Sequence, residues 1–197
     1  MTIRDFAAEL QSYLSSLPEV KSCRLYGSLS TGEDDDYSDI DIEVDVSGAD
    51  NGAFVTELPA QLAKRYPVIF FDYAPSLAPE KYIVTLALRE DAPFMLLDIT
   101  CTATPHVASR SKQDIRALNH GYDHTLKLFA ANLKHYLRGA DCHADILKMH
   151  DRIFGKEHTK NDAQMLTAVY GWLCENAEDR HRGYVAGFAA YMEQILA

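Results

Sequence analysis

The sequence lacks any apolar run long enough to cross a membrane, because no segment approaches about 18 uninterrupted apolar residues. Its start, MTIRDFAAELQSYLSSL, interleaves charged and apolar residues, unlike the apolar core of a signal peptide. Its four cysteines include no C-x-x-C pair, which argues against both a zinc knuckle and a redox motif. We therefore expect a cytoplasmic protein that has reduced cysteines and no membrane partner.

Positive charge is scarce in the first part of the chain. Residues 1–110 contain 8 Lys and Arg against 18 Asp and Glu, whereas residues 111–197 contain 11 of each kind. An acidic surface repels phosphate backbones, and no basic stripe with interleaved aromatic residues is present. The sequence therefore predicts no nucleic-acid partner. The excess of acids favours a cationic ligand, and it is also typical of a solvated acidic face.

The length and composition allow one two-part globular protein, since 47% of the 197 residues are hydrophobic. The first part alternates helical and strand patterns. The periodicity there predicts helices at 3–17 and 53–66, and strands at 20–26, 39–46, 68–74, 81–89 and 93–101. After the segment ATPHVASR, which is typical of a linker, only helical patterns follow. They predict a small bundle of helices at 111–137, 141–154, 162–175 and 180–196.

The segment DIDIEVDV, residues 39–46, has an acid at every second position. Since alternate residues of a strand point to opposite faces, Asp39, Asp41, Glu43 and Asp45 share one face and the apolar residues share the other. Neighbouring acids are about 6.6–7 Å apart at the backbone, so two carboxylates can share a divalent cation. This spacing suits a Mg²⁺ site that also holds substrate phosphates. The alternative is a sheet with a water-exposed polar face.

Two further features accompany this strand. Asp98 lies between apolar residues in PFMLLDITC, and a buried carboxylate needs a partner: an arginine, a hydroxyl or the same cation as Asp39. Gly27-Ser28 follows a predicted strand. The glycine allows close approach of the backbone to a ligand, and the serine hydroxyl can hold phosphate oxygens. Alone, such a pair is an ordinary turn.

The combination is more specific than its parts. Gly27-Ser28 is followed after ten residues by Asp39-Ile40-Asp41, in the local form GSLSTGEDDDYSDIDI, and Asp98 lies downstream. This pattern resembles the signature of the DNA polymerase beta-like nucleotidyltransferase superfamily. The likeness is strongest to its minimal members and to the antibiotic nucleotidyltransferases. It implies an α+β fold, in which a mixed sheet flanked by helices is followed by a helical bundle. The implied nucleotidyltransferase domain is 1–104, and the implied substrate-binding or dimerisation domain is 110–197.

The resemblance also implies roles for individual residues. Asp39, Asp41 and Asp98 would be the catalytic carboxylates and would bind two Mg²⁺ ions, while Gly27 and Ser28 would bind the triphosphate of ATP or another NTP. The reaction would be in-line attack of an acceptor hydroxyl on the α-phosphate, with pyrophosphate as the leaving group. Asp98 would then accept the proton.

The chain departs from the family pattern beside the glycine-serine pair. Many small members have Ala-Arg-Gly there, where this chain has Ser30-Thr31-Gly32. A cation from the helical part would have to replace that arginine. Five candidates are available, Lys112, Arg116, Lys127, Lys134 and Lys148.

These observations predict a nucleotidyltransferase that transfers a nucleoside monophosphate, AMP in the first instance, to a hydroxyl of a small acceptor. The acidic first part favours a cationic acceptor such as an aminoglycoside-like antibiotic. Modification of such an antibiotic would confer antibiotic resistance. Two alternatives stay open. One is a catalytically silent module for nucleotide binding, metal binding or dimerisation, and the other is a protein-modifying, AMPylating member of a toxin–antitoxin pair. A homodimer is also left open.

Overall fold

The computed structural model describes residues 2–74, 76, 78–156 and 160–196. The chain forms two compact units, one made of Met1–Leu88 with Met95–Asn119 and the other of Arg89–Phe94 with His120–Ala197. The short segment Arg89–Phe94 therefore belongs to the second unit, although the sequence on both sides of it belongs to the first. That residues 1–104 and 110–197 act as separate domains stays a prediction. Within the described part of the chain, no helix is long and apolar enough to cross a membrane.

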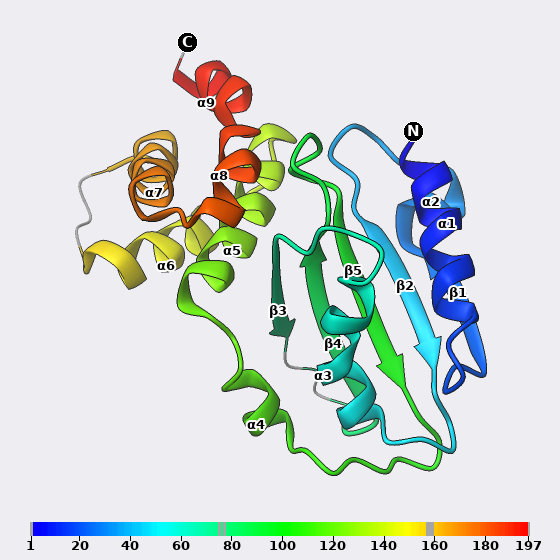
Figure 1. The fold of residues 1–197 in the computed structure, drawn as a ribbon. Helices are drawn as coiled ribbons and strands as arrows, with labels where there is room; N and C mark the ends of the chain where they lie inside the picture. Colours follow the sequence, from blue (N-terminus) through cyan, green and yellow to red (C-terminus); the bar gives the residue numbers. More distant parts are fainter. Residues whose placement is uncertain (1, 75, 77, 157–159, 197) are drawn as a thin grey trace. The chain divides into compact units, whose positions relative to one another are not determined.

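A five-stranded mixed sheet forms the centre of the first unit, as predicted (Figure 1). The strands are β1 (Ser22–Tyr26), β2 (Ile40–Asp45), β3 (Phe70–Ala74), β4 (Lys81–Ala87) and β5 (Leu96–Thr102). Their order across the sheet is β1-β2-β5-β4-β3, in which β2 and β5 are parallel and the other neighbours are antiparallel. Two strands from distant parts of the sequence, β2 and β5, thus lie side by side.

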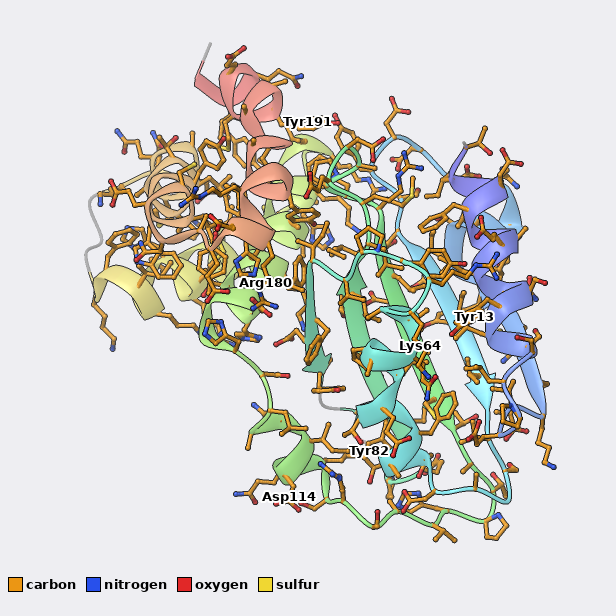
Figure 2. The ribbon with its side chains drawn as sticks, viewed as in Figure 1. Tyr13, Lys64, Tyr82, Asp114, Arg180 and Tyr191 are labelled. Carbon is orange, nitrogen blue, oxygen red and sulfur yellow. The ribbon has the colours of Figure 1, made fainter. Side chains whose placement is uncertain are left out.

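The apolar face of the sheet carries the core of the first unit. Ile40, Ile42 and Val44 of β2 are fully buried in one cluster with residues of α1 (Ile3–Ser15) and α3 (Asn51–Leu62). Each such side chain contributes about 1.5–3 kcal/mol on burial. The hydroxyl of Tyr13 on α1, labelled in Figure 2, donates a 3.0 Å hydrogen bond to the Gln61 carbonyl of α3 and so links the two helices.

The second unit is a helical bundle. Its helices are α5 (Gly121–Leu137), α6 (His143–Phe154), α7 (Asp162–Asn176), α8 (Asp179–Ala186) and α9 (Ala189–Leu196). The segment Arg89–Phe94 packs with them, because the Phe94 ring lies 5.6 Å from the Phe188 ring and 4.8 Å from the Tyr191 ring. The buried Tyr184 hydroxyl also donates a hydrogen bond to the Pro93 carbonyl. The α+β fold class, with a mixed sheet and a helical bundle after it, is confirmed.

Several predicted boundaries differ from the structure. The predicted helix at 111–137 is two helices, α4 (Lys112–Arg116) and α5, because Asn119 leaves the helical path. The Asn119 side chain accepts a 2.7 Å hydrogen bond from the Tyr73 amide of β3 and donates a 2.9 Å hydrogen bond to the Tyr73 carbonyl.

Two further differences arise at residues 93–94 and 187, and the helix predicted at 53–66 is α3, which ends at Leu62. Strand β5 begins at Leu96 rather than at residue 93, since Pro93 and Phe94 pack in the helical unit. The predicted helix at 180–196 is also two helices, α8 and α9. They are separated at Gly187, where an added Cβ would lie only 2.8 Å from the Glu90 carbonyl oxygen.

Candidate active site

The acidic face of β2 lies opposite the core. Burial alternates along the strand as the sequence predicts, with buried Ile40, Ile42 and Val44 between half-buried Asp41, Glu43 and Asp45. Asp39 is also half-buried and comes immediately before β2. The carboxylates therefore occupy a polar face that water can reach.

Strand register brings Asp41 and Asp98 together. Asp41 on β2 is the direct partner of Asp98 on β5, and on its other side it is the partner of Tyr26 on β1. Neighbouring strands are about 4.8 Å apart, and directly paired residues share a face. Two predicted site residues that are far apart in the sequence are thus adjacent on the polar face.

Gly27 fits closely against Asp41. It begins α2 (Gly27–Thr31) with a φ of +66°, in the left-handed region that favours glycine. A Cβ at this position would collide with Oδ2 of Asp41 and lie 3.1 Å from its Cγ. The turn after β1 therefore needs glycine for two reasons, the backbone conformation and the space taken by the carboxylate.

Ser28 belongs to a hydroxyl network in the loop before β2. Its Oγ donates a 3.3 Å hydrogen bond to Oγ of Ser38, which is only 3% exposed. The Ser38 hydroxyl in turn donates to Oδ1 of Asp35 and accepts from the Asp35 amide, both at 2.9 Å. This network holds Ser28 beside the residue that precedes Asp39.

Asp98 has the hydroxyl partner that its sequence context requires. Thr85 on β4 is its direct partner across the sheet, and the Thr85 Oγ1 donates a hydrogen bond to Oδ1 of Asp98. Thr85 is buried, whereas Asp98 is half-buried. Sequence reasoning did not single out Thr85. The only signal was a hydroxyl among the apolar residues of KYIVTLALR.

The acids farther along β2 have other partners. The Arg24 guanidinium donates to Oε1 of Glu43 at 2.8 and 3.1 Å. Asp45 accepts hydrogen bonds from the amide and hydroxyl of Ser47 at 2.8 and 2.6 Å, which closes the turn after the strand. Ion pairing and turn formation therefore account for these two acids.

Tyr26 extends over the acidic face. Its hydroxyl lies 3.1 Å from Oγ1 of Thr100 on β5, within hydrogen-bonding distance. Burial raises the pKa of Tyr26, and the negative charges of Asp41, Asp98 and Glu43 raise it further. The phenol therefore stays protonated at neutral pH beside the acidic pair.

The carboxylates meet part of what a metal site requires. Among residues 2–74, 76, 78–156 and 160–196, no group of three or more His, Cys, Asp or Glu side chains is placed to hold a metal ion. The adjacent Asp41 and Asp98 still fit Mg²⁺, which is usually bound through one or two carboxylates together with waters and substrate phosphates. The roles of Asp39, Asp41, Asp98, Gly27 and Ser28 stay predictions.

One of the five cations considered for the phosphate contact, Lys112, has other hydrogen-bond partners. The Lys112 Nζ donates a 2.7 Å hydrogen bond to the Ser76 carbonyl and a second one to the Ala78 carbonyl. It also lies 5.5 Å from the centre of the Tyr82 ring, which Figure 2 labels. Burial lowers the pKa of Lys112. Lys112 therefore holds the chain before β4, and the structure gives no reason to assign it to a triphosphate.

No protein-family model matches the chain, and no curated protein matches it. Among solved structures, it is similar to a GLD-2/RNP-8 complex, with 14% identity over 89% of this chain and 68% of that chain and a TM-score of 0.38. It is also similar to a STING-associated CdnE c-di-GMP synthase from Capnocytophaga granulosa, with 12% identity over 98% of this chain and 79% of that chain and a TM-score of 0.33. At these TM-scores, neither similarity carries an argument about activity.

Proposed function

We propose that this protein is a metal-dependent nucleotidyltransferase, which transfers a nucleoside monophosphate from an NTP to a hydroxyl of a small acceptor. The observation that carries the proposal is the direct pairing of Asp41 with Asp98 on parallel strands, with Gly27 fitted against Asp41. This arrangement agrees with the spacing of Gly27-Ser28 and Asp39-Ile40-Asp41 in the sequence.

The carboxylates would hold the metal ions, with Asp41 and Asp98 contributing most directly and Asp39 adjoining them. When bound, divalent ions neutralise phosphate charge and lower the pKa of the attacking hydroxyl. Ser28 would exchange its hydrogen bond to Ser38 for one to a phosphate oxygen. The Gly27 backbone, with no Cβ, would leave room for the triphosphate next to Asp41.

In the proposed reaction, the acceptor oxygen attacks the α-phosphorus in line and forms a new P–O bond. The bond from the α-phosphorus to the bridging oxygen breaks, and pyrophosphate leaves with the electron pair. The acceptor's proton passes to the Asp98 carboxylate, whose other task is to hold charge near the reacting phosphate. The rest of the rate acceleration would come from holding the acceptor hydroxyl and the α-phosphate in line.

We further propose a cationic acceptor such as an aminoglycoside-like antibiotic. The support is electrostatic, since the whole net charge of −10 arises from residues 1–110. A second candidate function is a silent module that binds Mg²⁺ and nucleotide without turnover. The pairing of Asp41 with Asp98 would serve that module as well, since two carboxylates can hold a cation without catalysis.

The test is pyrophosphate release by the purified protein with Mg²⁺, each of the four NTPs and a panel of aminoglycosides and lincosamides. Asp41→Asn is the inactivating variant. Asp36→Asn, the same change at an exposed acid of the loop, is the matched control. Acceptor-dependent release that Asp41→Asn lowers by at least about 100-fold and Asp36→Asn leaves unchanged would support the proposal.

Two other results would count against it. Release that is equal in both variants would remove Asp41 from the mechanism. No release with any acceptor, accompanied by Mg²⁺-dependent nucleotide binding in calorimetry, would favour the silent module.

A further inference from the structure

A row of polar side chains crosses the sheet through the proposed site. Strand register aligns Tyr26 on β1, Asp41 on β2, Asp98 on β5, Thr85 on β4 and Asp72 on β3. Directly paired residues share a face, so the row runs along the face opposite the core. Asp98 therefore has a carboxylate on one side and a hydroxyl on the other.

The hydroxyl side of Asp98 is fixed by Thr85. Thr85 is only 4% exposed, so its hydroxyl is shielded from water. A threonine side chain on a strand has few allowed χ1 values, which makes it a stiff donor. Its Oγ1 donates to Oδ1 of Asp98, and a hydrogen bond to an ionised carboxylate is stronger than one between neutral groups.

The main effect of this hydrogen bond is to restrict the orientation of the Asp98 carboxylate, rather than to compensate for the burial of its charge. Asp98 is half-buried, so water reaches part of the side chain. Loss of the Thr85 hydroxyl would remove a hydrogen bond that fixes the position of Oδ1 of Asp98. With Oδ1 held by Thr85, the orientation of the Asp98 carboxylate beside Asp41 is restricted.

We propose that Thr85 is the positioning residue for Asp98, which it orients as a metal ligand without touching the metal or the substrate. This inference rests on the proposed function. Groups that orient metal ligands commonly affect metal affinity or activity by about 10–100-fold when they are removed. Thr85→Val removes the hydroxyl and keeps the branched shape, so we expect it to weaken metal binding by about 10-fold or more.

The experiment measures Mn²⁺ binding, in the presence of a non-hydrolysable α,β-methylene ATP analogue, by electron paramagnetic resonance on the full chain. It needs no turnover and no known acceptor. Thr85→Ser keeps the hydroxyl and should restore the wild-type affinity. Thr102→Val is the matched control, because Thr102 lies on β5, the strand of Asp98, but directs its hydroxyl to the Val44 carbonyl. Urea unfolding of each variant shows whether it is folded.

The outcomes separate the inference from the proposed function. Weaker Mn²⁺ binding in folded Thr85→Val, restored in Thr85→Ser and unchanged in Thr102→Val, is the expected result. Wild-type affinity in Thr85→Val, together with loss of binding in Asp41→Asn, would overturn the role of Thr85 and leave the metal site standing. Equal binding by the wild type and Asp41→Asn, or none by the wild type, would overturn both.

Discussion

Replacing Gly27 with alanine tests the close fit between the turn after β1 and Asp41. The substitution forces a Cβ into a backbone with φ +66°, which costs about 1–2 kcal/mol for a residue other than glycine. It also places that Cβ against Oδ2 of Asp41, so the carboxylate has to move by about 1 Å. A misplacement of that size can lower the rate by about 100-fold.

Gly32→Ala is the matched control for this prediction. Gly32 has a φ of +81°, so alanine carries a similar backbone strain there, but nothing lies within 4 Å of the added Cβ. We expect Gly32→Ala to lose about 1–2 kcal/mol of unfolding free energy in urea titrations, and Gly27→Ala to lose at least as much, because its Cβ also meets Asp41. In the pyrophosphate-release assay, only Gly27→Ala should lose about 100-fold in rate. Equal rates for the two variants would refute the reasoning.

The remaining predictions concern stability. Asp50→Ala should cost about 1 kcal/mol in urea unfolding, since Asp50 caps α3 through the Ala53 amide. Although burial opposes ionisation, hydrogen bonds from Ser109 and Ala53 hold the pKa of Asp50 below its usual range. Asp50 should therefore contribute fully to the free energy of unfolding above about pH 4, and this contribution should disappear as the pH falls through the lower folded-state pKa. A cost of Asp50→Ala that does not depend on pH would contradict this. Asp123→Ala should cost about 1–3 kcal/mol in thermal unfolding, because it removes the carboxylate that lies 3.0 Å from buried His181, and an unchanged melting temperature would contradict this.

Local patterns in the sequence predicted the acidic face and much of the fold. Strict alternation at residues 39–46 predicted β2 and the side to which each residue points, because a strand has a period of two. The helical spacing at 3–17 predicted α1 for a similar reason. A hydroxyl partner for Asp98 was among the options that its apolar context required.

Long-range pairing was not available from the sequence. The direct pairing of Asp41 with Asp98 depends on the register between two strands that are more than fifty residues apart. Thr85 was missed because a threonine in an apolar strand is ordinary until the neighbouring strand is known. The break before α5 depends on Asn119 reaching Tyr73, and helical periodicity does not encode such a contact.

A double-mutant cycle of pyrophosphate release tests most directly whether Asp41 and Asp98 act as a unit. The four proteins are the wild type, Asp41→Asn, Asp98→Asn and the variant with both changes, assayed with Mg²⁺, an NTP and the acceptor found in the panel. If both carboxylates hold the same ion, the double variant should be about as slow as the slower single variant, because effects within a unit are not additive. Multiplied losses in the double variant, or full activity in either single variant, would contradict the account.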